Sequence, residues 1–193
     1  MKEIEIRTER LLLKRLTPSK AHDVFVYRSD PEIYRFQNFK PGTIEEVISF
    51  IEGCSPTPNI EGSWYQLGVF LNNELIGDCG LHFLGPENSQ VEIGYTIARS
   101  HQRKGYGKEC IVSILDFLFG TLRKHRVIAS LDTKNEASVK LMDKLGFRRE
   151  GLFRKSILAG GNWVDNLIYA MLDDEWTSRN RMSNQPNDTH SIR

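Results

Sequence analysis

The residues best suited to chemistry in this sequence are the two glycines of the segment 102–108, which reads QRKGYGK. The segment follows a predicted strand and opens an amphipathic helix. Unpaired amides at a helix start point outward beside the positive end of the helix dipole, and glycines let an anion approach the backbone closely. The spacing therefore predicts a site for a pyrophosphate group.

Two common nucleotide-binding motifs do not fit this segment. A dinucleotide-binding fingerprint needs a third glycine where Cys110 stands, and a P-loop needs Ser or Thr where Glu109 stands. The pattern that remains is Q/R-x-x-G-x-G/A, and through it the chain resembles the GNAT superfamily. The resemblance implies that the loop binds the pyrophosphate of acetyl-CoA.

The resemblance extends from about Arg7 to Trp176. It includes TERLLL at 8–13, EIGY at 92–95, Asn135-x-x-Ser138 and LGFRREG at 145–151, which are similar to the RimJ and RimL type of ribosomal-protein amino-terminal acetyltransferase. It implies an α/β domain of the α+β type with the GNAT fold, in which a mixed, mostly antiparallel sheet of six to seven strands carries helices on both faces. We expect one domain over 1–176 and a polar, disordered tail over 177–193.

The resemblance assigns acetyl-CoA, the acetyl donor, to a defined set of residues. It implies that backbone groups of Tyr95, Thr96 and Ile97 pair with the pantetheine arm as an added strand would, and that Asn135 holds the cofactor chain through its amide. The amides that cradle the pyrophosphate would be those of Arg103, Lys104, Gly105, Tyr106, Gly107 and Lys108. Alternatively, the glycines only connect a loop to a helix, the basic side chains are merely solvated, and Asn135 is a helix N-cap.

Acetyl transfer by direct attack needs a neutral amine and a proton for the leaving thiolate, without a covalent enzyme intermediate. Many GNAT enzymes supply that proton from a tyrosine, but the matching position here is Met142, which has no proton to donate. Ser138 matches the serine attributed to RimL-type enzymes and is the candidate acid. Its alternative role is that of a small packing residue on a helix face.

Glu92 is the candidate general base because many GNAT members use a glutamate of this strand. A half-exposed strand glutamate also needs no catalytic explanation. Asp165 and His82 are reserve candidates. RimL-type enzymes have a carboxylate after the GF segment. The matching position in this chain is Ile157, which has no carboxylate, so the base of those enzymes has no counterpart here.

Hydrophobic periodicity predicts the elements that must position these residues. A capping box at Thr43 and Glu46 marks one helix start, and Gly146 marks a helix end. The expected strands are 10–16, 64–71, 75–84, 91–98, 127–131, 153–158 and 163–172, and the expected helices are 20–28, 43–54, 107–120 and 135–146.

Composition limits the partners of this 193-residue chain. Its 26 Lys and Arg balance 25 Asp and Glu, so a net charge of +1 gives no general attraction to nucleic acid or membranes. The start of the chain is unlike a secretory signal, and its longest apolar passage is too short for a membrane span. We expect a cytoplasmic monomer or homodimer, and no metal site because HExxH and CxxC patterns are absent.

The acceptor is an amine whose identity stays open at this point. An alanine or serine amino terminus of a protein is favoured, while small amines and amine-bearing antibiotics form the alternative. The absent tyrosine supports a third hypothesis, a catalytically weak module that binds acetyl-CoA. The acceptor wall is expected from the first two helices and the loop 35–39.

Overall fold

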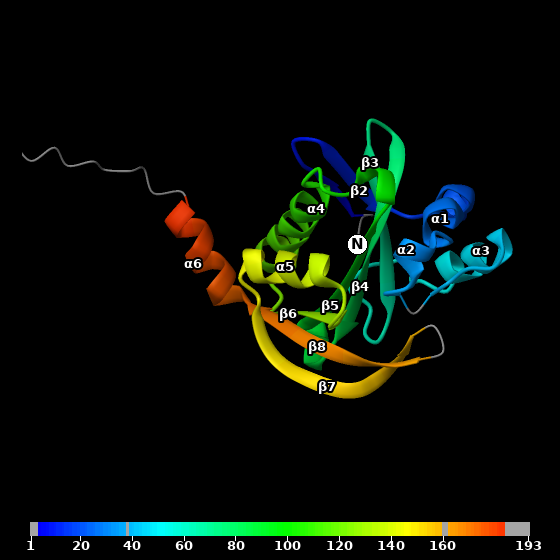
Figure 1. The fold of residues 1–193 in the computed structure, drawn as a ribbon. Helices are drawn as coiled ribbons and strands as arrows, with labels where there is room; N and C mark the ends of the chain where they lie inside the picture. Colours follow the sequence, from blue (N-terminus) through cyan, green and yellow to red (C-terminus); the bar gives the residue numbers. More distant parts are fainter. Residues whose placement is uncertain (1–3, 38, 160–161, 184–193) are drawn as a thin grey trace, which may run out of the picture.

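The computed structural model describes residues 4–37, 39–159 and 162–183 (Figure 1). The strands are β1 (Glu5–Arg7), β2 (Leu11–Arg15), β3 (Trp64–Leu71), β4 (Glu74–Leu84), β5 (Gln90–Ile97), β6 (Arg126–Asp132), β7 (Arg148–Ala159) and β8 (Asn162–Leu172). The helices are α1 (Ala21–Arg28), α2 (Pro31–Tyr34), α3 (Ile44–Glu52), α4 (Tyr106–Leu115), α5 (Glu136–Leu145) and α6 (Asp173–Ser183).

All eight strands form one sheet in the order β1-β2-β3-β4-β5-β6-β8-β7. Every neighbouring pair is antiparallel except β5 and β6, which run parallel. Their pairing stops at Ile93 and Ala129, although β5 continues to Ile97 and β6 to Asp132. The sheet therefore contains a gap between the ends of its two central strands.

Helices cover both faces of this sheet, with α4 and α5 on one side and α1, α2 and α3 on the other (Figure 1). The larger core lies under α4 and α5, where Ile111, Ile114 and Leu118 are fully buried against the strands. A smaller core under α1 and α3 contains Val24 and Val47. Burial of these apolar side chains holds the two layers in place.

Local signals fix the helix ends as the sequence predicts. Thr43 Oγ1 accepts a hydrogen bond from the Glu46 amide at 3.3 Å, and Glu46 Oε2 accepts one from the Gly42 amide at 2.7 Å. These bonds satisfy two amides at the start of α3. Gly146 ends α5 with a φ of +75°, a conformation that favours glycine.

The fold class is confirmed, although the short helix α2 was not predicted and two further details differ. The sheet has eight strands rather than six to seven, because Glu5–Arg7 pairs with β2 as an additional edge strand. The C-terminal end also differs, because residues 177–183, which were expected to begin a disordered tail, belong to helix α6.

Helix α6 is held by its own contacts with the core. The indole of Trp176 is buried and donates to Asp116 at 2.9 Å, and Arg179 donates to the Leu145 carbonyl at 2.9 Å. Residues 184–193 of the predicted tail lie outside the described residues. None of the helices in the described part of the chain is long and apolar enough to cross a membrane.

Candidate active site

The glycine loop lies at the end of β5 and at the start of α4. Gly105 is the N-terminal flanking residue of α4 and has a φ of +86°, which is left-handed backbone. The Gln102 side chain donates to the Ile97 carbonyl at 2.9 Å and ties the loop to β5. The first amides of a helix have no intrahelical acceptor, so this turn presents hydrogen-bond donors to a ligand.

An N-terminal segment braces this loop, a role that sequence reasoning did not assign. Glu109 on α4 accepts hydrogen bonds from Thr8 Oγ1 at 2.5 Å and from Arg10 Nε at 2.7 Å. Burial opposes ionisation of Glu109, but these bonds outweigh it and lower the pKa of the carboxyl. Arg10 also donates to the Lys104 carbonyl at 3.1 Å, and its guanidinium lies over the Tyr106 ring. The guanidinium is thereby fixed beside the loop, with its charge paired to Glu109.

Ser138 and Asn135 lie at the start of α5. Asn135 Oδ1 accepts from the Ser138 amide at 3.2 Å, so the capping alternative holds for that oxygen. The Tyr95 hydroxyl donates to Ser138 Oγ at 3.0 Å. Burial, only partly offset by this bond, raises the pKa of Tyr95 to about 12, so its phenol stays protonated at neutral pH. Tyr95 was predicted only through its backbone, and its side chain is an additional member of the site.

Met142, at the position of the usual tyrosine, is fully buried in the core.

Gly107 has ordinary van der Waals space for a methyl group beside Tyr95 and Leu141. That room agrees with the G/A alternative in the loop pattern.

Glu92 lies on the opposite face of β5 in a row that crosses three strands. The register places Trp64, His82 and Glu92 side by side on β3, β4 and β5. The His82 ring stacks on Trp64 with centroids 4.7 Å apart, and His82 Nδ1 lies 3.7 Å from Glu92 Oε2. Asp165 instead accepts from the Lys155 amide at 2.8 Å.

A cavity of about 290 Å³ opens beside Glu92. Its lining includes both faces of β5, with Glu92 and Gly94 from one and Ile93 and Tyr95 from the other. The remaining walls are Arg28, Phe36, Gln37, Phe39, Phe50, Trp64, Gln66, Gly80, Ser130, Asp132, Ile157 and Val164. The expected loop residues at 36, 37 and 39 thus line it, whereas Asn38 lies outside the described residues.

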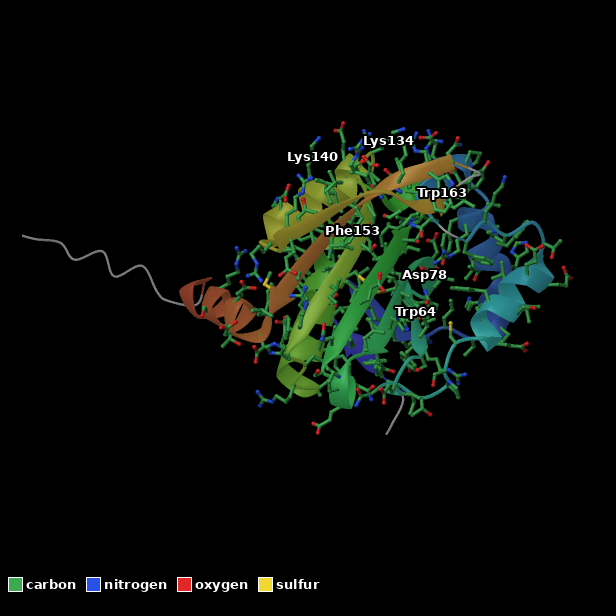
Figure 2. All side chains as sticks on the ribbon, turned by 90° about the horizontal axis from the view of Figure 1, so that it is seen from below. Trp64, Asp78, Lys134, Lys140, Phe153 and Trp163 are labelled. Atoms are coloured by element: carbon green, nitrogen blue, oxygen red, sulfur yellow. The ribbon has the colours of Figure 1, made fainter. Side chains whose placement is uncertain are left out.

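The inner wall of the cavity contains a buried ion pair. Arg28 donates from Nε and Nη2 to the two oxygens of Asp78, at 2.8 and 2.6 Å, and the Tyr27 hydroxyl donates to Asp78 at 2.7 Å. Burial opposes the charge of Arg28, but attraction by Asp78 outweighs it and raises the pKa of the guanidinium. In Figure 2, Asp78 and Trp64 lie between the central strands and helices α1 and α3.

The predicted residues therefore fall into two groups that meet at the gap in the sheet. The loop, Asn135 and Ser138 gather around α4 and α5, and Glu92 faces the cavity on the other side. Tyr95 joins the groups because it lines the cavity and contacts Ser138. Neither Asp165 nor Met142 lines the cavity.

Comparison with known proteins identifies the family of this chain. The family profile described as "Acetyltransferase (GNAT) domain" matches residues 10–148. The N-acetyltransferase p20 of Bacillus licheniformis, itself uncharacterized, is 31% identical over 175 residues, which cover 88% of this chain and 96% of p20. The [ribosomal protein uS5]-alanine N-acetyltransferase of Escherichia coli is 31% identical over 120 residues, which cover 61% of this chain and 62% of that enzyme.

A solved structure extends the agreement to three dimensions. The crystal structure of a GNAT-family acetyltransferase from Bacillus anthracis superposes with a TM-score of 0.79 at 29% identity and covers 89% of this chain and 100% of that chain. Sequence similarity and fold therefore both identify the same family. This chain belongs to the GNAT family of N-acetyltransferases.

Proposed function

We propose that this enzyme transfers the acetyl group of acetyl-CoA to a primary amine, most favourably the amino terminus of a protein. The observation that carries the proposal is the placement of the gap between β5 and β6 directly beside the glycine loop. Residues 94–97 of β5 have no partner on β6, so an extended pantetheine arm can pair there as an added strand does.

The described residues fit an anionic coenzyme. The left-handed backbone at Gly105 and the start of α4 suit a pyrophosphate, with amides of Arg103, Lys104, Gly105, Tyr106, Gly107 and Lys108 as donors. Tyr95, Thr96 and Ile97 would align the pantetheine. Asn135 Oδ1 already caps α5, which leaves the Asn135 Nδ2 group for the cofactor.

Glu92 is proposed to take a proton from the substrate ammonium, directly or through water. The neutral amine then attacks the acetyl carbonyl carbon, a C–N bond forms and the C–S bond breaks. Ser138 is proposed to donate a proton to the departing sulfur and to regain one from the Tyr95 hydroxyl through their hydrogen bond. The substrate ammonium loses two protons in all. Glu92 passes the first to solvent, and the second, lost by the nitrogen after attack, returns to Tyr95.

The relatives support a protein acceptor. The Escherichia coli enzyme with 31% identity is named for acetylating an alanine of ribosomal protein uS5. A small amine is the alternative acceptor, and a catalytically weak binding module is the alternative function.

Free-thiol release from acetyl-CoA, measured over amino-terminal peptides, polyamines and aminoglycosides, discriminates among them. Peptide-dependent release supports the proposal. Saturable binding of acetyl-CoA by calorimetry without release from any amine would support the binding module.

A further inference from the structure

The side chain of Gln66 is buried against the cavity and lacks a protein partner. Gln66 is 5% exposed and lines the cavity, and its amide forms no hydrogen bond within the described part of the chain. Its amide atoms keep contact with the cavity, unlike His82 Nδ1, which is fully buried without a hydrogen-bond partner in the described part of the chain. The exposed remainder of this amide faces the cavity, so a ligand there is its available partner.

Two glycines create room beside this amide. The register places Gln66, Gly80 and Gly94 next to one another on β3, β4 and β5. A Cβ at Gly80 would lie 2.8 Å from Gln66 Oε1, so the amide extends over Gly80. A Cβ at Gly94 would meet nothing within 4 Å. The Trp64 ring also covers Gly80. The result is a trough whose open part is the space over Gly94, which runs from the gap in the sheet to the Gln66 amide.

The length of this trough matches one amino-acid residue. Neighbouring strands lie about 4.8 Å apart, so an amine above Gly94, beside Glu92, is roughly that distance from the amide above Gly80. In a peptide, the first peptide group lies within this distance of the α-amine. An amide of Gln offers both a donor and an acceptor, as a peptide group requires.

The charges around the trough favour a neutral group behind the amine. Arg28 Nη1 has no acceptor among the described residues, but the charge of Arg28 is neutralised by Asp78. Glu92 and Asp132 add two carboxylates to the cavity lining. This balance attracts a cationic amine and disfavours a free carboxylate next to it.

We propose that Gln66 and Arg28 form an acceptor subsite that binds the peptide group following the substrate's amine. The enzyme thereby selects α-amino amides, such as peptide amino termini, over alkyl amines and free amino acids. This inference rests on the proposed acetyl-transfer function.

The test compares alaninamide, isopropylamine and free alanine as acceptors of the same size class, with thiol release as the readout. We expect kcat/KM to be highest for alaninamide. Gln66→Met keeps the volume and removes the polar group, so it lowers kcat/KM for alaninamide about tenfold and leaves isopropylamine unchanged. Because the amide forms no hydrogen bond within the described protein, the variant should keep at least the melting temperature of the parent without substrate.

Gln90→Met is the matched control, because Gln90 lies at the far end of β5 outside the cavity lining. It leaves the acceptor preference of the parent enzyme unchanged. A Gln66→Met variant that loses activity equally with all acceptors and melts lower would show a structural role and overturn the subsite. Equal use of alaninamide and isopropylamine by the parent would also overturn it while acetyl transfer stands. Thiol release from none of the acceptors, peptides included, would instead contradict the proposed function.

Discussion

The two sides of the gap in the sheet present different kinds of polar groups. Around the glycine loop, the side chains of Arg10, Gln102 and Glu109 bond to other parts of the protein, which leaves the main chain to meet a ligand. In the cavity lining, Gln66 forms no side-chain hydrogen bond within the described residues, and His82, the strand neighbour of Glu92, has an unpaired Nδ1. The first side is suited to one invariant ligand, and the second is suited to an acceptor that differs among relatives.

The largest expected effect tests the cavity side through Glu92. Glu92→Gln removes the proposed base, and kcat should fall about 10²- to 10⁴-fold. Steady-state thiol release with a peptide acceptor measures it. Glu45→Gln, on the exposed start of α3, is the matched control. Unchanged turnover in Glu92→Gln would clear this residue of the role.

Variants of the buried ion pair test how strongly the stability of the protein depends on the pairing of Arg28 with Asp78. Asp78→Asn leaves the Arg28 charge buried without its partner, and the free energy of unfolding should fall by about 3–5 kcal/mol. Urea denaturation measures the change. Because removing both charges avoids that penalty, Asp78→Asn combined with Arg28→Met should recover much of the loss. A stable single variant would show that Arg28 is not dependent on Asp78.

Ser138 tests the other side of the gap. Ser138→Ala should lower kcat about 10²-fold with saturating substrates if its hydroxyl protonates the thiolate. Tyr95→Phe removes the hydrogen-bond donor to Ser138 and should cost about tenfold. Since the pKa of Tyr95 is raised to about 12, its effect should persist at mildly alkaline pH. The same kcat in Ser138→Ala and the parent would exclude the residue from the mechanism.

Gly105 tests main-chain recognition of the cofactor. An alanine at its φ of +86° strains the loop by about 1–2 kcal/mol, so KM for acetyl-CoA should rise about tenfold. Gly62→Ala is the matched control because Gly62 has a φ of +67°, open space around it and no place in the loop. Both variants lose stability, but only Gly105→Ala should affect KM. Equal KM values would argue against main-chain binding at this turn.

The smallest expected effect, on stability, comes from a surface ion pair outside the glycine loop and the cavity. Hydrogen bonds from Arg126, and then from Arg148, outweigh burial and lower the pKa of Glu150 to about 2. A lowered carboxyl pKa gives stability that is present above the ordinary value and is lost as pH falls toward 2. Glu150→Gln should reduce this acid sensitivity by about 1 kcal/mol or less. Melting curves between neutral and acid pH measure it, and identical curves for parent and variant would contradict the shift.

The local elements of this protein were predictable because their signals are contiguous. The capping box at Thr43, the stop at Gly146 and the glycine loop each depend on neighbouring residues, and the structure has them as predicted. Strand β1 was missed because its three residues are too few to show a period, and it pairs with the next strand, β2. Helix α6 was missed because it depends on a distant partner, through the contact between Trp176 and Asp116, which are 60 positions apart.

The sequence by itself determined the family and the glycine loop, since a helix start with glycines has the same backbone chemistry wherever it is placed. Only the tertiary structure decided which residues line the cavity. Arg28, Gln66, Glu92 and Asp132 come from separate elements, and strand register together with helix packing brings them to one cavity. The Tyr95 contact with Ser138 has the same origin, because it joins residues 43 positions apart.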